Sequence, residues 1–259
     1  MDEKRLAKLL DALPLGAWRY LKTTASTNDD AAHWVSAGAP DVSVVLAEEQ
    51  TRGRGRLNRQ WFTPPGSALA ISIILRPRLA EAAHPARVTA LGALAVCEMI
   101  AGVCGLQATI KWPNDVLLDG KKVCGVLNET QWLGEQPRAF VLGIGVNVLQ
   151  SAVPPMNFLR YPATSLESAC GNAPPRENCA AALLTALLRW REKLATDDFL
   201  AEWQARLHGR GNWVQILFDK QPSLRARIEG LEADGALRVQ EDGGATRRIE
   251  FGEIGLQFD

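Results

Sequence analysis

A short segment rich in arginine and glycine is the first part of the sequence whose residue types suit work on an anion. It spans Glu49–Trp61, reads EQTRGRGRLNRQW, and holds four arginines and two glycines. Guanidinium groups donate paired hydrogen bonds to phosphate or carboxylate, and glycines let backbone N–H groups come close to an anion. The segment lacks the lysine and the spacing of a P-loop. A solvated basic loop and an RNA-binding patch are the alternatives that its residues leave open.

A lysine ends an apolar stretch in the segment Lys111-Trp112-Pro113-Asn114-Asp115. Before a Pro-Asn-Asp turn, such a lysine presents one cation at a fixed place. A point charge there can neutralise the oxygens of a carboxylate that attacks a phosphate. The alternative is an ordinary surface lysine at a junction between a strand and a turn.

Glycines inside apolar, strand-like segments form a third feature. Gly125 lies within 122–129, and Gly143 and Gly145 lie within the segment GIGVN. A glycine in a strand indicates that a ligand or another part of the chain comes close, although a bulge or tight packing is the alternative. The GIGVN segment is not a dinucleotide-binding fingerprint, because no helix start follows it.

Polar residues at a predicted helix start complete the set. Ser26-Thr27-Asn28 precedes Asp29 and Asp30, and the segment continues with helical character. The short polar side chains are typical of a helix N-cap, and they can also meet a ligand. Both roles are compatible with the sequence.

Secondary-structure elements that could position these residues follow from periodicity and from turn residues. Helices are expected over 2–13, from Ser26 onward, over 86–103 and over 176–207. Strands are expected over 18–21, 42–47, 61–62, 68–75 and 140–148, with a hairpin of 109–118 and 122–131 around Asp119-Gly120. Beyond Gly209–Asn212, five short strands over 213–218, 224–231, 236–240, 246–249 and 254–258 predict a small barrel.

Composition excludes several classes of protein. Lys+Arg and Asp+Glu both count 29, so no overall charge favours nucleic acid or a membrane as a partner. The five cysteines form no CxxC pair and the three histidines are far apart, which predicts free thiols in a reducing cytosol and no histidine metal centre. Without an apolar run of 18 residues or a signal peptide, we expect a soluble, cytoplasmic protein.

Taken together and in this order, the STN, GRGR, KWPND, Lys122…Gly125, GIGVN and Ala163-Thr164-Ser165-Leu166 segments closely resemble the biotin–protein ligase family. The resemblance runs from about residue 18 to the end of the chain. It implies an α+β fold, a mixed β-sheet with flanking helices of the class II aminoacyl-tRNA synthetase/biotin synthetase type, plus a small C-terminal SH3-like β-barrel. The implied domains are 1–210 for catalysis and 211–259 for the barrel.

The resemblance also implies roles for individual residues. The implied biotin-binding residues are Ser26, Thr27, Asn28, Gln50, Arg54, Gly55, Arg56, Lys111 and Gly125. Those implied for ATP or the adenylate are Arg54, Arg56, Trp61, Lys111, Asn114, Lys122 and Asn147. Lys111, Arg54 and Arg56 are the implied catalytic residues, while the ligands of Mg²⁺ stay unknown.

Two departures from the family pattern concern the loop. Leu57-Asn58 stands where the family loop usually ends in glycine, and Arg52 adds a charge where a small residue is common. Asparagine tolerates the left-handed conformation, so the turn can survive, but loop closure is expected to be weaker. About 25 residues precede the STN segment, too few for a winged-helix domain, so no DNA-binding repressor role is expected.

The implied activity has two steps. Biotin and Mg-ATP give biotinyl-adenylate, and biotin then passes to a lysine of a biotin carboxyl carrier protein domain. A homodimer is left open. A lipoate–protein ligase and a non-enzymatic RNA-binding protein are the alternatives; the GRGR and KWPND segments argue against the first, and the neutral net charge argues against the second.

Overall fold

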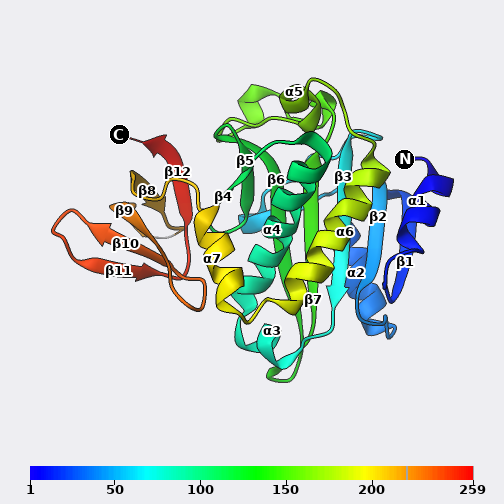
Figure 1. Ribbon diagram of the computed structural model, residues 1–259, viewed down its shortest axis with the longest axis horizontal. Helices are drawn as coiled ribbons and strands as arrows, with labels where there is room; N and C mark the ends of the chain where they lie inside the picture. Colours follow the sequence, from blue (N-terminus) through cyan, green and yellow to red (C-terminus); the bar gives the residue numbers. More distant parts are fainter. Residues whose placement is uncertain (220, 259) are drawn as a thin grey trace.

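Two β-sheets organise the protein, and the computed structural model describes residues 1–219 and 221–258 of it. The larger sheet is mixed and carries helices on both faces, whereas the smaller sheet is antiparallel and C-terminal (Figure 1). This arrangement confirms the expected α+β class with a mixed sheet and flanking helices.

The larger sheet has seven strands in the order β1-β2-β3-β7-β6-β5-β4. Strands β1 and β2 are parallel, and every other neighbouring pair is antiparallel. The bounds are β1 Ala17–Thr24, β2 Ser43–Gln50, β3 Ala68–Leu75, β4 Thr109–Lys111, β5 Asp115–Leu118, β6 Lys121–Leu133 and β7 Gln136–Asn147.

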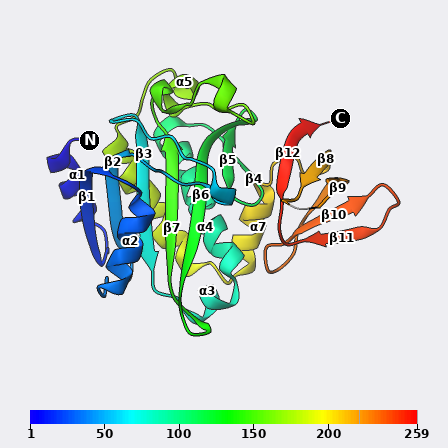
Figure 2. The ribbon, with the colours of Figure 1, turned by 180° about the vertical axis from the view of Figure 1, so that it is seen from behind.

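Helices cover the two faces of this sheet unequally. The bounds are α1 Glu3–Leu10, α2 Thr27–Ser36, α3 Leu79–Ala83, α4 Pro85–Cys104, α5 Leu166–Cys170, α6 Arg176–Glu192 and α7 Asp197–Ala205, with short 3-10 turns η1 Arg56–Asn58, η2 Gln150–Ala152 and η3 Met156–Phe158. Helices α4 and α6 lie on one face (Figure 1), and α2 and the segment that carries η1 lie on the other (Figure 2).

The sequence of β3 shows why the two faces differ. Alternate side chains of a strand point to opposite faces. Leu69, Ile71 and Ile73 belong to the main core, which α4 and α6 share, whereas Ile74 packs in a smaller cluster with residues of α2. Ser72 places a hydroxyl on the α2 face, where it donates to Thr27 and Asn28. The face with the small and polar residues is the one that holds the cavity described below.

Three expected elements differ from the observed ones. The helix expected over 176–207 is two helices, because α6 ends before Lys193 and the hydroxyl of Thr196 caps a new helix, α7. The strand expected over 109–118 is divided by the turn at Pro113, since proline has no N–H for the sheet. Trp61 and Phe62 form no strand; Gln60 and Thr63 make only isolated bridges.

The smaller sheet has the strand order β11-β10-β9-β8-β12. Its bounds are β8 Trp213–Leu217, β9 Leu224–Leu231, β10 Leu237–Glu241, β11 Thr246–Ile249 and β12 Glu253–Phe258. The five expected strands are confirmed, although over 213–219 and 221–258 no pairing joins the outer strands β11 and β12 into a closed barrel.

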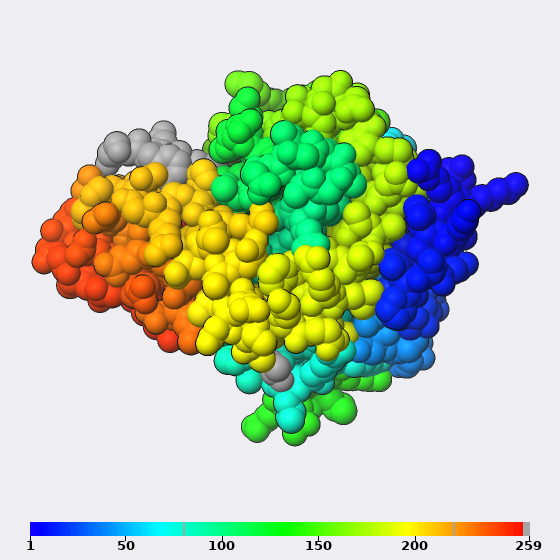
Figure 3. Space-filling view, viewed as in Figure 1, coloured from blue at the N-terminus to red at the C-terminus, as the bar shows by residue number. Residues whose placement is uncertain are grey.

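The smaller sheet lies beside α7 (Figure 1), and the molecular surface continues from α7 onto the strands of the smaller sheet (Figure 3). The turn between β9 and β10 contributes two hydrogen-bond acceptors to this junction. Trp112 donates to the carbonyl of Gly235 at 3.0 Å, and Arg87 donates to the carbonyl of Ala233. Gly235 has φ of +92°, and a Cβ there would lie 2.7 Å from Trp203, so the turn requires glycine twice over.

Helix α4 has the length and apolar composition of a membrane span, but it lies in the middle of the folded core. Two thirds of its most apolar stretch (67%) is buried inside the protein. A central helix between a sheet and further helices needs such a composition for packing alone.

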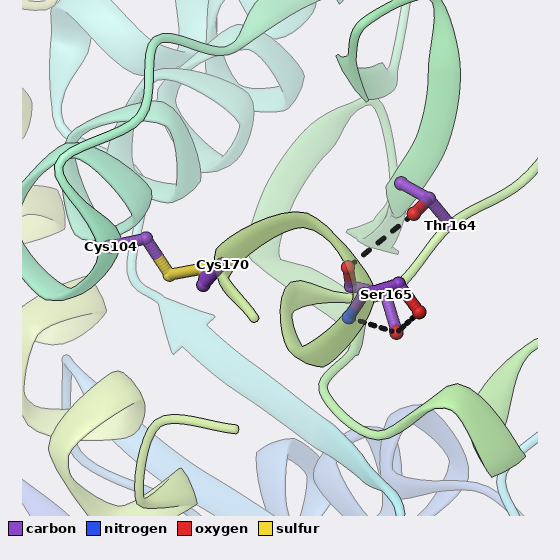
Figure 4. Close-up of a disulfide and its surroundings, with 5 residues drawn as sticks. Cys104, Thr164, Ser165 and Cys170 are labelled. Carbon is purple, nitrogen blue, oxygen red and sulfur yellow. Dashed lines mark hydrogen bonds between the residues drawn. A yellow bond between two sulfur atoms is a disulfide. The ribbon is translucent and has the colours of Figure 1, made fainter. Parts of the chain in front are cut away.

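The cysteines require one correction. Cys104 at the end of α4 and Cys170 at the end of α5 form a disulfide, with Cα atoms 5.8 Å apart, although all five cysteines were expected to be free (Figure 4). Folding brings together two residues that are 66 positions apart, which spacing in the sequence does not reveal. Cys97, Cys124 and Cys179 are buried and free as expected, and burial raises the pKa of Cys97 and of Cys179 to about 12.

Candidate active site

A cavity of about 730 Å³ lies on the α2 face of the larger sheet. Its walls come from the start of α2, the segment 54–62, strands β6 and β7, the segment 152–163 and one residue of β12. The predicted site residues that line it are Ser26, Thr27, Asn28, Gln50, Arg54, Gly55, Arg56, Trp61, Asn114, Lys122, Gly125 and Asn147. Folding thus brings together every predicted site residue except Lys111.

One end of the cavity is lined by hydrogen-bonding side chains, and the partners of two of them are fixed by the fold. Gln50 accepts from the backbone N–H of Thr27 at 2.8 Å and from its hydroxyl at 3.0 Å, and it donates to Thr63 at 3.2 Å. Ser26 occupies the N-cap position of α2, is 3% exposed and makes no capping hydrogen bond with its side chain. The capping role that the sequence allowed for Ser26 is therefore not used, and its hydroxyl lies at the cavity.

The floor is made by glycines, as their positions in the strands predicted. A Cβ on Gly145 would lie 2.3 Å from the Trp61 ring, and one on Gly125 would lie 3.2 Å from the same ring. A Cβ on Gly143 would lie 2.3 Å from Asn28. The three glycines let Trp61 and Asn28 lie directly on the sheet. The Trp61 Nε1 is buried without a hydrogen-bond partner among the described residues, so it can donate to a ligand.

Three arginines of the 51–61 loop, Arg54, Arg56 and Arg59, each have a side-chain partner. Arg54 pairs with Asp29 and with Glu129, the latter at 2.8 Å. Arg56 donates to the Asn114 side chain at 3.0 Å.

The loop ends in an unusual backbone. Asn58 has φ of 58°, as expected for asparagine in place of glycine, but Leu57 before it also has a positive φ, of 56°. Leucine rarely adopts this conformation, which costs about 1–2 kcal/mol per residue. Other contacts of the loop must offset that cost.

The two lysines of the site have different surroundings. Lys111 is 1% exposed and is not among the residues that line the cavity; its Nζ lies 3.3 Å from Glu253 Oε1 and 3.5 Å from Asp115 Oδ2. Lys122 lines the cavity, and its Nζ lies 2.7 Å from Asp115 Oδ1. The lysine cation that reaches the cavity is therefore that of Lys122, while Lys111 stands behind the wall.

Glu253 is a site residue that the sequence did not indicate. It comes from β12, lines the cavity, and accepts from Arg59 at 2.6 Å and from Lys111 at 3.3 Å. Burial opposes its ionisation, but the hydrogen bond from Arg59 and the charge of Lys111 outweigh burial and lower the pKa of Glu253 to about 2. A carboxylate of the smaller sheet thus stays ionised between two cations of the larger part.

Other lining residues were also missed. Tyr161 lies under Lys111, with Nζ 4.3 Å from the ring centroid, and its hydroxyl is buried without a partner in the described chain. The segment 152–163, which contributes Phe158 and Arg160, forms one wall. No short motif marks this segment before Ala163, which begins the Ala163-Thr164-Ser165-Leu166 segment and pairs with Lys122 in an isolated bridge.

No protein-held metal centre is evident in the described residues, where no three His, Cys, Asp or Glu side chains form a suitable group. Asp115 and Glu253 border the cavity, but lysines and an arginine already neutralise both carboxylates. These donors fit a magnesium ion that arrives with nucleotide phosphates and keeps much of its own water, rather than one held by a cage of carboxylates.

The fold and the site define a ligase of the biotin and lipoate type. Residues 20–147 match the biotin/lipoate A/B protein ligase family, and residues 213–256 match the biotin protein ligase C-terminal domain. The biotin–[acetyl-CoA-carboxylase] ligase of Paracoccus denitrificans is 34% identical, over 88% of this chain and 95% of that protein. The corresponding ligase of Mycobacterium tuberculosis is 30% identical, over 98% of this chain and 95% of that protein. The chain belongs to the biotin protein ligase family.

A solved structure of the same family has a similar fold. The biotin protein ligase of Aquifex aeolicus in complex with biotin and ATP superimposes with a TM-score of 0.80 at 25% identity, covering 94% of this chain and 99% of that one.

The bifunctional ligase/repressor BirA of Bacillus spizizenii is 39% identical over 59% of this chain, and the match spans 46% of that longer protein. The chain thus matches about half the length of the bifunctional relative.

Proposed function

We propose that the protein is a biotin–protein ligase, which makes biotinyl-adenylate from biotin and ATP and transfers biotin to a lysine of a biotin carboxyl carrier protein domain. The observation that carries this proposal is the composition of one cavity. Ser26 and Thr27 provide hydrogen bonds at one end, and Arg56 and Lys122 provide positive charge elsewhere in the same space. The polar ring system of biotin needs hydrogen-bonding groups. The biotin carboxylate and the phosphates of ATP need positive charge nearby.

In the first step an oxygen of the biotin carboxylate forms a bond to the α-phosphorus, the bond to the β-phosphate breaks, and pyrophosphate leaves. Both reactants are anions, so fixed cations lower the barrier. We propose this role for Lys111 and Arg56 and extend it to Lys122. Arg56 and Lys122 line the cavity, and Lys111 lies behind its wall, against Asp115 and Glu253. Burial lowers the pKa of Arg56, yet a guanidinium stays charged at neutral pH.

In the second step the carrier lysine amine forms a bond to the acyl carbon of the mixed anhydride, and AMP leaves with the electron pair of the broken C–O bond. The loop over the cavity keeps water from the anhydride, and positioning of the amine matters more than strong base catalysis. Mg²⁺ would enter with ATP and neutralise its phosphates; Asn114 and Asp115, which line the cavity, would be its candidate ligands on the protein.

The partners we propose are biotin, Mg-ATP and the carrier domain, in the cytoplasm and without DNA. The equal numbers of basic and acidic residues, 29 each, support the last point. A homodimer is a separate proposal, which light scattering with and without biotin and ATP would test.

The decisive experiment is incubation of the protein with ATP, biotin and a carrier domain, followed by intact-mass measurement of the carrier. We expect one added biotin on one lysine, and none without ATP. Lipoate in place of biotin is the matched control. Transfer of lipoate but not biotin would support the lipoate–protein ligase alternative, and RNA binding without ATP turnover would support the RNA-binding one.

A further inference from the structure

Arg54 is the one predicted catalytic residue whose charged group is held from outside the cavity. Its Nη2 lies 3.0 and 2.8 Å from the two carboxylate oxygens of Glu129, and its Nη1 pairs with Asp29. Neither Asp29 nor Glu129 is among the residues that line the main cavity. Two carboxylates on one guanidinium leave little positive charge for a phosphate, so Arg54 is suited to anchor the loop.

Glu129 connects this anchor to the polar end of the cavity. Its Oε2 accepts from the amide of Asn28 at 2.6 Å, and the oxygen of that amide accepts from Ser72 at 2.6 Å. The amide of Asn28 also lies directly on Gly143. The position of Glu129 is thereby fixed by the sheet itself, from β6, while Asp29 is fixed by the first turn of α2.

The loop needs such an anchor because its backbone is strained. Leu57 and Asn58 both have positive φ, and without other contacts the segment would leave this conformation readily. A second, smaller cavity of about 390 Å³ separates part of the loop from β6, so apolar packing does not hold it there. The loop is kept in place by side-chain contacts at Arg54, Arg56 and Arg59 and, at its start, by backbone hydrogen bonds from Thr51 and Arg52.

We propose that Glu129 and Asp29 form a clamp on Arg54 that keeps the 51–61 loop folded over the cavity. Glu129 and Asp29 are positioning residues, and Arg54 acts through them on the loop instead of contacting the reacting phosphate. The consequence for catalysis rests on the proposed ligase function: the clamp slows the escape of biotinyl-adenylate and has little effect on its formation.

An ordinary surface ion pair is the competing explanation. The side chains of Arg54, Glu129 and Asp29 are 41%, 35% and 38% exposed, and pairs with such exposure often contribute nothing measurable. The two explanations differ in what removal of the clamp does to the loop. A clamp predicts a more open loop, whereas a surface pair predicts no change.

Limited trypsin digestion of the ligand-free protein distinguishes them, because the loop contains its own cleavage sites. Glu129→Gln removes the charge but keeps an oxygen that can accept from Asn28, and Asp29→Asn is the second variant. We expect each to raise the rate of cleavage after Arg56 and Arg59 about two- to five-fold, as for the loss of one well-placed ion pair. Glu135→Gln, in the exposed turn before β7, is the control and should not change the rate.

A double-mutant cycle tests the partner. Glu129→Gln should add no further cleavage after Arg56 and Arg59 in a protein that already carries Arg54→Gln. Unchanged cleavage in both single variants, or full additivity with Arg54→Gln, would overturn the clamp. Melting temperatures of the variants should match that of the unchanged protein, which separates loop opening from global unfolding.

The ligase consequence is measured separately, as the dissociation rate of preformed biotinyl-adenylate and as the rate of pyrophosphate release. We expect faster dissociation in Glu129→Gln by a similar factor, with pyrophosphate release nearly unchanged. A loop effect in a protein that makes no adenylate would leave the clamp standing and refute the proposed function. Adenylate formation with no effect of Glu129→Gln on cleavage or dissociation would refute the clamp alone.

Discussion

Arg56 and Lys122, two cations that line the cavity, each meet a hydrogen-bond acceptor or a carboxylate of the protein. Arg56 meets Asn114, and Lys122 meets Asp115 at 2.7 Å. Groups fixed in this way need little reorganisation when negative charge develops beside them, which is the main source of electrostatic catalysis. Lys111 and Lys122 share the carboxylate of Asp115, so the two lysines belong to one group of charges beside the cavity.

The first prediction at this scale concerns Lys122. Lys122→Ala should lower the rate of pyrophosphate release about 10²–10³-fold, as for removal of one group that stabilises developing charge, with a smaller loss of biotin affinity. Lys121→Ala is the matched control, because Lys121 is the exposed neighbour in the same strand. Pyrophosphate release and biotin binding would be measured separately. Near-normal pyrophosphate release in Lys122→Ala would show that another cation stabilises the developing negative charge.

The second prediction concerns the strained loop end. Asn58→Gly should slow the release of biotinyl-adenylate, because glycine adopts a φ of 58° without strain and favours the closed loop. Leu57→Gly should slow release further, since leucine is costlier than asparagine in that conformation. Asn172→Gly, at an exposed position outside the positive-φ set, controls for a general glycine effect. Equal or faster release in both loop variants would show that the loop closes well as it is.

At the scale of elements, the last strand carries a residue of the smaller sheet into the site. Strand β12 belongs to the smaller sheet, yet its first residue, Glu253, lies between Lys111 and Arg59 of the larger part. The smaller sheet therefore contributes to the active site through one side chain as well as through packing. The turn at Gly235, which accepts from Trp112 and lies close to Trp203, is a second contact of the smaller sheet with the larger part.

Glu253→Gln should destabilise the protein by about 1–3 kcal/mol, because it removes one of two carboxylates from a buried lysine. It should also weaken the hold on Arg59, so adenylate formation should fall more than the stability change explains. Arg238→Ala is the control from the same sheet; Arg238 pairs only with Glu229 and Glu232 among the described residues and should matter little. Urea unfolding and pyrophosphate release are the measurements. A full loss of adenylation in folded Arg238→Ala would contradict the site assignment.

At the scale of the whole molecule, the carboxylates of Glu48 and Glu253 both have a lowered pKa although they lie in different sheets. Burial opposes the ionisation of Glu48 as it does that of Glu253, but a hydrogen bond from Arg176 and further donors lower the pKa of Glu48 to about 2. Glu48 lies in β2 of the larger sheet and Glu253 in β12 of the smaller one. Acid should therefore weaken both parts of the protein together.

The sign of the pH effect follows from the direction in which the two pKa values move on folding. Both are lower in the folded protein than the ordinary 4.5, so the stability they contribute is fully present above about pH 4.5 and is lost as the pH falls toward 2. We expect the free energy of unfolding to fall by roughly a few kcal/mol across this window, because a tenfold change in proton affinity corresponds to about 1.4 kcal/mol. Glu253→Gln should show a shallower loss. Equal slopes of unfolding free energy against pH in the two proteins would contradict the lowered pKa of Glu253.

Much of the fold was predictable because its signals are local. The apolar run of β3, the apolar length of α4 and the five short strands at the end were expected nearly where they occur. The break between α6 and α7 was not, because the leucine pattern continues across it and only the capping hydroxyl of Thr196 marks it. The disulfide of Cys104 and Cys170 was missed for the opposite reason: nothing local links two helix ends 66 residues apart.

The sequence by itself determined the family pattern and the residue types of the site, since motifs such as Ser26-Thr27-Asn28 and the loop glycines depend on chemistry at neighbouring positions. Only the tertiary structure decided which charges meet. Whether Lys111 or Lys122 faces the cavity depends on the pairing of β5 with β6 and on a carboxylate 142 residues away, Glu253. Whether Arg54 can bind phosphate depends on Glu129, 75 residues away. Electrostatic roles are set by distances of a few ångströms in space, and sequence separation carries no information about them.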